Sequence, residues 1–131
     1  MLDPRTRQVV AKSERFLNTG RWALENGDPE SAASRTYYAL YHMTILLLRL
    51  VRGRFRVRWD HDQLNNAFLD EFCKPGFRFS RRDGDDWGYI KGARLQADYG
   101  RPPLAHRRAQ RSLERAEQLI AKKGVEVERN A

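Results

Sequence analysis

The chain has 131 residues, and its 25 Lys and Arg against 17 Asp and Glu give a formal net charge of +8. This length favours a single domain over residues 1–131, because domains commonly run to about 100–200 residues. One cysteine excludes an internal disulfide framework, and no Cys/His cluster has metal-ligand spacing, so we expect neither a metal nor another cofactor. The charge favours a polyanionic partner such as nucleic acid, although a GC-rich genome would also enrich arginine.

No part of the sequence has the pattern of a membrane span. The longest apolar run, residues 39–50, contains His42 and Arg49 and is shorter than the roughly 20 residues that a bilayer requires. The N-terminus carries charge but lacks the apolar core of a signal peptide. We therefore expect a cytoplasmic protein with no membrane partner.

Proline and glycine divide the first half of the chain into segments of helical length. The Asp-Pro pairs at 3–4 and 28–29 each combine an N-cap with a proline at the first helical position, and Asn26-Gly27 is a stop signal. These signals predict helices over about 4–25 and 29–52. Residues 37–48 are apolar nearly all round, which is typical of a helix at the centre of a bundle.

The second half predicts three more helices. Asp60 is the expected N-cap of a helix that ends at residues 74–76. The acidic residues 83–86 begin a second helix, which stops at Gly100. The last helix runs from about 104 to Lys123, with Gly124 as its C-cap and a frayed tail after it. The connector 53–59 is compatible with a short strand or an extended loop. The short connections predict an all-α, up-and-down bundle of four to five helices.

Three features resemble the HEPN-domain family in order and spacing. Residues 30–42 (ESAASRTYYALYH) are similar to the family's Ala-Ser-Arg-x-Tyr-Tyr-Ala-x-Phe-His helix, His61 begins a helix with aromatic residues at 68 and 72, and residues 94–99 resemble an Arg-x-x-Ala-Asp-Tyr segment. The resemblance covers about residues 5–123 and is closest to small stand-alone prokaryotic members. It implies a helical bundle whose relatives are often metal-independent ribonucleases, toxins, or partners of a nucleotidyltransferase that acts as antitoxin.

Catalytic HEPN proteins pair an Arg-x(4 to 6)-His motif across a homodimer. The resemblance implies that the imidazole would activate the ribose 2′-OH or protonate the leaving group, while the arginine stabilises the phosphorane charge. With 20 arginines in the chain, Arg/His pairs with related spacing arise readily by chance, so their position must discriminate between them. The pairs are Arg35…His42, Arg56…His61 and Arg101…His106.

Each of these pairs has an alternative interpretation. Arg35 and His42 are seven residues apart and share a helix face, but they are interpreted first as a buried ion-pair hub and a satisfied core histidine. His61 is interpreted as a surface or capping residue. Arg101 and His106 have the required count at a helix start, but two prolines stiffen the link between them.

The segment that best fills the functional position by resemblance contains Arg94, Asp98 and Tyr99. Arg94 and Asp98 stand at i and i+4, which permits a salt bridge on one helix face. Tyr99 occupies the place of the expected histidine, and a tyrosine with a pKa near 10 is a poor base at neutral pH. It would contact a nucleobase, be modified by a partner, or join a structural Arg-Asp-Tyr network. The candidate catalytic residues are therefore Arg94, Asp98, Tyr99, Arg35 and His42.

Two arginine-rich segments are interleaved with aromatic residues, a pattern suited to single-stranded RNA. Arginines would hold phosphates while exposed rings stack on bases. The alternative is that the rings pack under the ends of the bundle and the arginines are only solvated. The candidate nucleic-acid-binding residues are Arg54, Arg56, Arg58, Arg78, Arg81 and Arg82.

The sequence supports three functional hypotheses. The first is an RNA-directed protein, either a ribonuclease toxin of a toxin–antitoxin pair or a relic of one. The second is a non-catalytic module that docks a nucleotidyltransferase or binds nucleotides. The third is a structural interaction protein whose charge is genomic background. The partners expected from the resemblance are RNA or a nucleotide, a nucleotidyltransferase antitoxin and a second copy of the chain.

Overall fold

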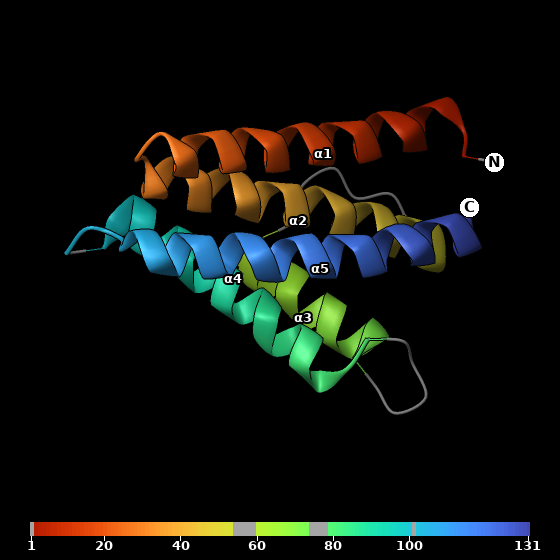
Figure 1. Cartoon of the computed structure of the whole chain (residues 1–131). Coiled ribbons are helices and arrows are strands. Elements are labelled where there is room, and N and C mark those ends of the chain that lie inside the picture. Colours follow the sequence, from red (N-terminus) through yellow and green to blue (C-terminus); the bar gives the residue numbers. More distant parts are fainter. Residues whose placement is uncertain (1, 54–59, 74–78, 101) are drawn as a thin grey trace.

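The computed structural model describes residues 2–53, 60–73, 79–100 and 102–131, and over these residues it contains five helices and no strand (Figure 1). The all-α bundle predicted from the sequence is confirmed. The connector predicted over 53–59 lies almost wholly outside the described residues. No helix of the described residues is long and apolar enough to cross a membrane. The elements are α1 (Pro4–Glu25), α2 (Pro29–Arg52), α3 (His61–Phe72), α4 (Arg81–Tyr99) and α5 (His106–Asn130).

Helices α1 and α2 form an antiparallel hairpin whose ends follow the predicted signals. The carboxylate of Asp3 accepts the Thr6 backbone N–H at 2.8 Å, and that of Asp28 accepts the Ser31 N–H at 3.1 Å. Gly27 has φ +78° and lets the chain reverse between the helices. Helix α2 contacts each of the other four helices, as its apolar composition predicts.

Helix α4 begins slightly earlier than the acidic residues 83–86 predicted. Ser80 is its N-cap, because the Ser80 hydroxyl accepts the Asp83 backbone N–H at 3.2 Å while the Asp83 carboxylate accepts the Ser80 N–H at 2.8 Å. This reciprocal pair is a capping box, so the N-cap lies three residues before its acidic partner Asp83 and the helix starts at Arg81. Asp60 caps α3 as predicted, accepting the N–H groups of Asp62 and Gln63.

Helix α5 does not end at Lys123, and the prediction of a Gly124 cap with a frayed tail is wrong. The helix continues to Asn130, since Lys123 and Val127 are both buried against the bundle. A glycine inside a helix costs about 1 kcal/mol relative to alanine, and the packing of the last two turns offsets that cost. In Figure 1, α1, α2 and α5 run alongside one another, while α3 and α4 diverge from them on one side.

Candidate functional site

Arg94 of α4 lies against the tyrosines of the central helix α2. Its Nη2 donates a hydrogen bond to the Tyr38 hydroxyl at 3.2 Å, and its guanidinium carbon is 5.5 Å from the Tyr37 ring centroid and 5.6 Å from that of Tyr38. Only 10% of the Arg94 side chain is exposed. Such contacts between a guanidinium and aromatic faces are attractive, and they hold the charge in a defined place.

Asp98 and Tyr99 complete the end of α4 around this arginine. The Asp98 carboxylate is 2.9 Å from Nε of Arg94, so the salt bridge that the i, i+4 spacing permits is formed. The Tyr99 ring centroid is 5.8 Å from the guanidinium carbon, and this residue is 74% exposed. The structure therefore brings together the three residues that the Arg94 segment predicted.

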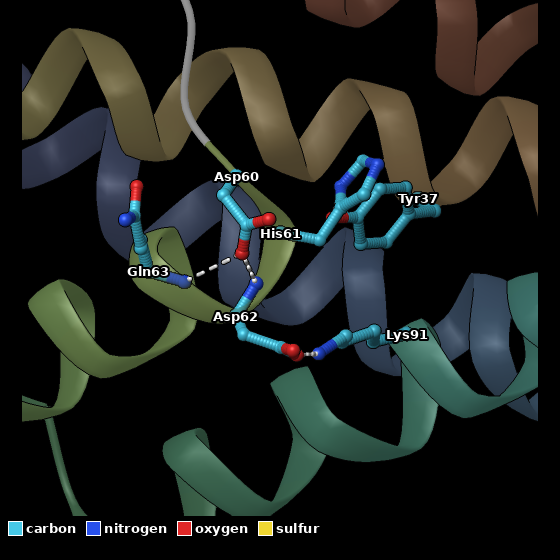
Figure 2. A network of polar contacts seen from close by, with 6 residues as sticks. All are labelled: Tyr37, Asp60, His61, Asp62, Gln63 and Lys91. Carbon is cyan, nitrogen blue, oxygen red and sulfur yellow. Dashed lines mark hydrogen bonds and ion pairs between the residues drawn. The ribbon is translucent and has the colours of Figure 1, made fainter.

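His61, the first residue of α3, joins the same tyrosines from the other side. Its Nδ1 shares a hydrogen bond with the Tyr37 hydroxyl, and the two ring centroids are 5.2 Å apart (Figure 2). The start of α3 is fixed by the Asp60 cap and by an ion pair between Asp62 and Lys91 of α4. His61 is thus not only the surface or capping residue that the sequence suggested.

We call Tyr37, Tyr38, His61, Arg94 and Asp98 the Arg94 cluster. Burial, followed by the nearby charges of Arg94 and Lys91, lowers the pKa of His61, so its imidazole is neutral at pH 7. Burial raises the pKa of the Tyr37 phenol, which therefore keeps its proton. The cluster holds a neutral imidazole and a guanidinium cation around the same two tyrosine rings.

Arg35 and His42 do not belong to the Arg94 cluster. Arg35 is exposed, with its guanidinium carbon 5.4 Å from the Phe16 ring centroid, so the interpretation as a buried ion-pair hub is wrong. Its position on α2 faces the edge of the α1–α2 interface, where solvent reaches the guanidinium. His42 is half-buried between the rings of Phe16 and Tyr41, and this burial lowers its pKa to about 4.

The other predicted residues are only partly described. Arg81 and Arg82 are exposed in the first turn of α4, and His106 is exposed at the start of α5, where it lines a cavity of about 370 Å³ between α1 and α5. Within the described ranges, no three His, Cys, Asp or Glu side chains gather in a way that could hold a metal ion. The candidates that lie outside the described residues are Arg54, Arg56, Arg58, Arg78 and Arg101.

Sequence reasoning missed the contact between His61 and Tyr37. These residues are 24 positions apart and lie on different helices, so no helical periodicity links them. A signal was nevertheless present, because each residue belongs to one of the three segments that carried the family resemblance. Spacing alone did not show that these segments meet at one place in the fold.

The fold and site define an all-α bundle with an Arg-His-Tyr cluster where its second, third and fourth helices meet. The sequence model of the HEPN domain matches residues 6–126, and the chain belongs to this family. HEPN domains are associated with ribonuclease or nucleotide-related functions. A search of curated proteins finds no match.

Proposed function

We propose that this protein acts on RNA at the Arg94 cluster, as a metal-independent endoribonuclease of the toxin type. The observation that supports this proposal is that Arg94 and a neutral His61, 33 positions apart in the chain, contact the same pair of tyrosine rings. A guanidinium and a neutral imidazole are the groups that phosphodiester cleavage needs for charge stabilisation and proton transfer.

The reaction uses a nucleophile that RNA itself supplies. The ribose 2′-OH attacks the adjacent phosphorus, the bond from phosphorus to the 5′ oxygen breaks, and a 2′,3′-cyclic phosphate remains. In the tautomer in which Nδ1–H of His61 donates to the Tyr37 oxygen, Nε2 holds the lone pair that accepts the 2′-OH proton. Arg94 stabilises the negative charge of the phosphorane, and the departing 5′ oxygen takes up a proton from water.

Asp98 and Tyr99 support this arrangement in different ways. Asp98 holds the guanidinium at one edge through the 2.9 Å ion pair, which leaves its orientation fixed before RNA binds. The exposed Tyr99 ring provides a surface on which a nucleobase can stack. Tyr99 is therefore assigned to substrate binding in this proposal, and His61 takes the role of proton acceptor.

Cleavage of a labelled single-stranded RNA in the presence of EDTA tests the proposal. We expect products with 2′,3′-cyclic phosphate ends, and a loss of rate of about 10²-fold or more in His61→Gln and in Arg94→Gln. Arg107→Gln, at an exposed position of α5, is the control and should cleave like the wild type. Cleavage that persists in both cluster variants would indicate a contaminating nuclease and would remove this site assignment.

A second candidate is a non-catalytic module that binds nucleotides or docks a nucleotidyltransferase. It is favoured by Tyr99, which replaces the histidine of catalytic relatives, and by Asp98, which already neutralises Arg94. This candidate predicts RNA or nucleotide binding without cleavage, and co-elution with a co-expressed nucleotidyltransferase in size-exclusion chromatography. Separate elution of the two proteins would count against docking.

A homodimer is part of the proposal, because HEPN catalytic groups are paired across two copies. The outer face of α4 carries two exposed apolar side chains, Leu95 at 41% and Tyr99 at 74%. Both lie on the helix that carries Arg94, so a second copy seated there would place two Arg94 clusters near one another. Exposed apolar residues grouped beside a functional site are typical of an interface.

A further inference from the structure

We propose that the α1–α2 face carries a phosphate-binding subsite for single-stranded RNA, formed by Lys12, Phe16, Arg35 and His42. We call it the Phe16 subsite. It rests on the proposed function, because it assumes that the ligand of this protein is RNA. The Phe16 subsite is a second contact region, separate from the Arg94 cluster. It binds the phosphates and bases of the RNA strand that extend beyond the reacting nucleotide.

Two cations converge on one aromatic ring at this place. Nζ of Lys12 lies 5.7 Å from the Phe16 ring centroid, and the guanidinium carbon of Arg35 lies 5.4 Å from it. The cations come from different helices, α1 and α2, and both side chains are exposed. Neither forms an ion pair with a carboxylate in the part of the chain that the structure describes.

Two unneutralised charges of one sign near a single ring form a site for an anion. Each cation is attracted to the Phe16 ring, so both positive charges remain beside the same side chain in spite of their repulsion. A phosphodiester bound by both side chains offsets part of this positive charge, and its binding releases counterions. Arginine adds a planar set of donors that fits two phosphate oxygens, whereas lysine supplies a point charge.

His42 connects this subsite to the Arg94 cluster through a series of ring contacts. Its ring centroid is 5.6 Å from that of Phe16 and 5.5 Å from that of Tyr41, which in turn is 5.6 Å from His61. Because the pKa of His42 is lowered to about 4, its imidazole is neutral near pH 7 and acts here as an aromatic surface. The four rings form a continuous path from α1 to the start of α3.

A row of partly exposed rings beside unpaired cations has the chemistry of a surface for single-stranded nucleic acid. Aromatic rings stack on any base, while cations follow the backbone, so such a surface binds with little sequence preference. A duplex would use this surface less well, because its bases are stacked on one another and are not free to stack on aromatic side chains. The occupant inferred for this face is therefore the unpaired part of an RNA substrate.

Fluorescence anisotropy with a labelled single-stranded 2′-O-methyl oligonucleotide of about 12 nucleotides tests the subsite. This probe keeps the phosphates and bases but lacks the 2′-OH nucleophile, so binding is measured without cleavage. The double variant Lys12→Gln/Arg35→Gln should bind about 5-fold or more weakly, with a log–log salt slope smaller by about 0.7 for the one phosphate contact that is lost. Phe16→Leu keeps an apolar side chain and should also bind about 5-fold more weakly.

The matched control is Arg107→Gln/Arg111→Gln, which removes the same charge from exposed positions of α5. We expect its affinity to stay close to that of the wild type. Equal weakening in the two double variants would show that only net charge matters and would overturn the subsite, as would unchanged affinity in Lys12→Gln/Arg35→Gln. Wild-type protein that binds this probe but does not cleave unmodified RNA would keep the subsite and remove the catalytic proposal, so the two can fail separately.

Discussion

At the scale of single residues, Lys123 shows how strongly burial changes chemistry in this bundle. The side chain is completely buried, and its amine donates a hydrogen bond to the Thr44 hydroxyl. Nζ also lies 3.7 Å from the Phe68 ring centroid and 5.0 Å from that of Trp87. Because the charged form loses its hydration in these surroundings, burial lowers the pKa of Lys123 well below its ordinary value.

Replacement of this lysine should stabilise the protein and flatten its pH dependence. In the unfolded chain the Lys123 amine has a pKa of about 10.4. At any pH between its lowered pKa in the folded protein and about 10.4, the unfolded state therefore binds more protons than the folded state. The free energy of unfolding therefore rises with pH across that window. Lys123→Met removes this titration and should raise stability at pH 7 by about 1 kcal/mol or more.

Urea unfolding at neutral pH and near pH 9 measures both effects. Thr44 keeps a partner in the variant, because its hydroxyl also donates to the Leu40 carbonyl at 2.8 Å. Lys122→Met is the matched control, since it removes an amine one residue earlier that is half-exposed and not buried. An equal slope in Lys123→Met and the wild type would contradict the burial argument.

The sequence predicted contacts within a helix better than contacts between helices. The Arg94–Asp98 ion pair follows from i, i+4 spacing alone, because helix geometry places these side chains side by side. The hydrogen bond between His61 and Tyr37 depends on where α3 begins relative to α2, which spacing does not determine. For the same reason Arg35 looked buried in the sequence pattern, yet it lies at the open edge of the α1–α2 interface.

At the scale of elements, helix ends with side-chain caps were predictable and the end of α5 was not. Asp3, Asp28 and Asp60 each accept backbone N–H groups of the following turn, so a local signal fixes each start. Gly124 carries the same local signal as a C-cap, but the burial of Lys123 and Val127 continues the helix through it. Tertiary packing outweighed the propensity of one residue.

Substitution of Gly124 by alanine tests this account of α5. A Cβ at Gly124 would meet no atom within 4 Å, so Gly124→Ala should stabilise the protein by about 1 kcal/mol, the helix-propensity difference. Gly53 is the matched control, because its added Cβ also meets nothing, but its φ of +66° is left-handed. Gly53→Ala should destabilise by about 1 kcal/mol. Thermal or urea unfolding measures both, and destabilisation by Gly124→Ala would mean that α5 ends where the sequence suggested.

At the scale of the whole molecule, the excess positive charge is unevenly paired. Along the seam between α4 and α5, Lys122 pairs with Asp83, and Arg115 lies 3.4 Å from Asp86. On the α1–α2 face, Lys12 and Arg35 have no such carboxylate partner among the described residues. The net charge of +8 in the sequence predicted a polyanionic partner, but only the fold distinguishes basic residues that hold helices together from those left to solvent.

The proposed homodimer has its interface on the outer face of α4. Leu95→Asp should convert a homodimer into monomers, because the new carboxylate would be buried without a partner at the interface. We expect the dissociation constant to rise about 30-fold, the equivalent of about 2 kcal/mol, in sedimentation analysis. Circular dichroism should be unchanged, since Leu95 is 41% exposed and lies outside the core.

The control variant for this face uses an exposed valine on a different helix. Val125 of α5 is 53% exposed, so Val125→Asp introduces the same charge away from the proposed interface and should leave the dimer intact. If catalysis requires two Arg94 clusters, Leu95→Asp should also lose RNA cleavage, and higher protein concentration should restore it in part by mass action. A wild-type protein that sediments as a monomer at micromolar concentration, or a Leu95→Asp variant that remains dimeric, would contradict this arrangement.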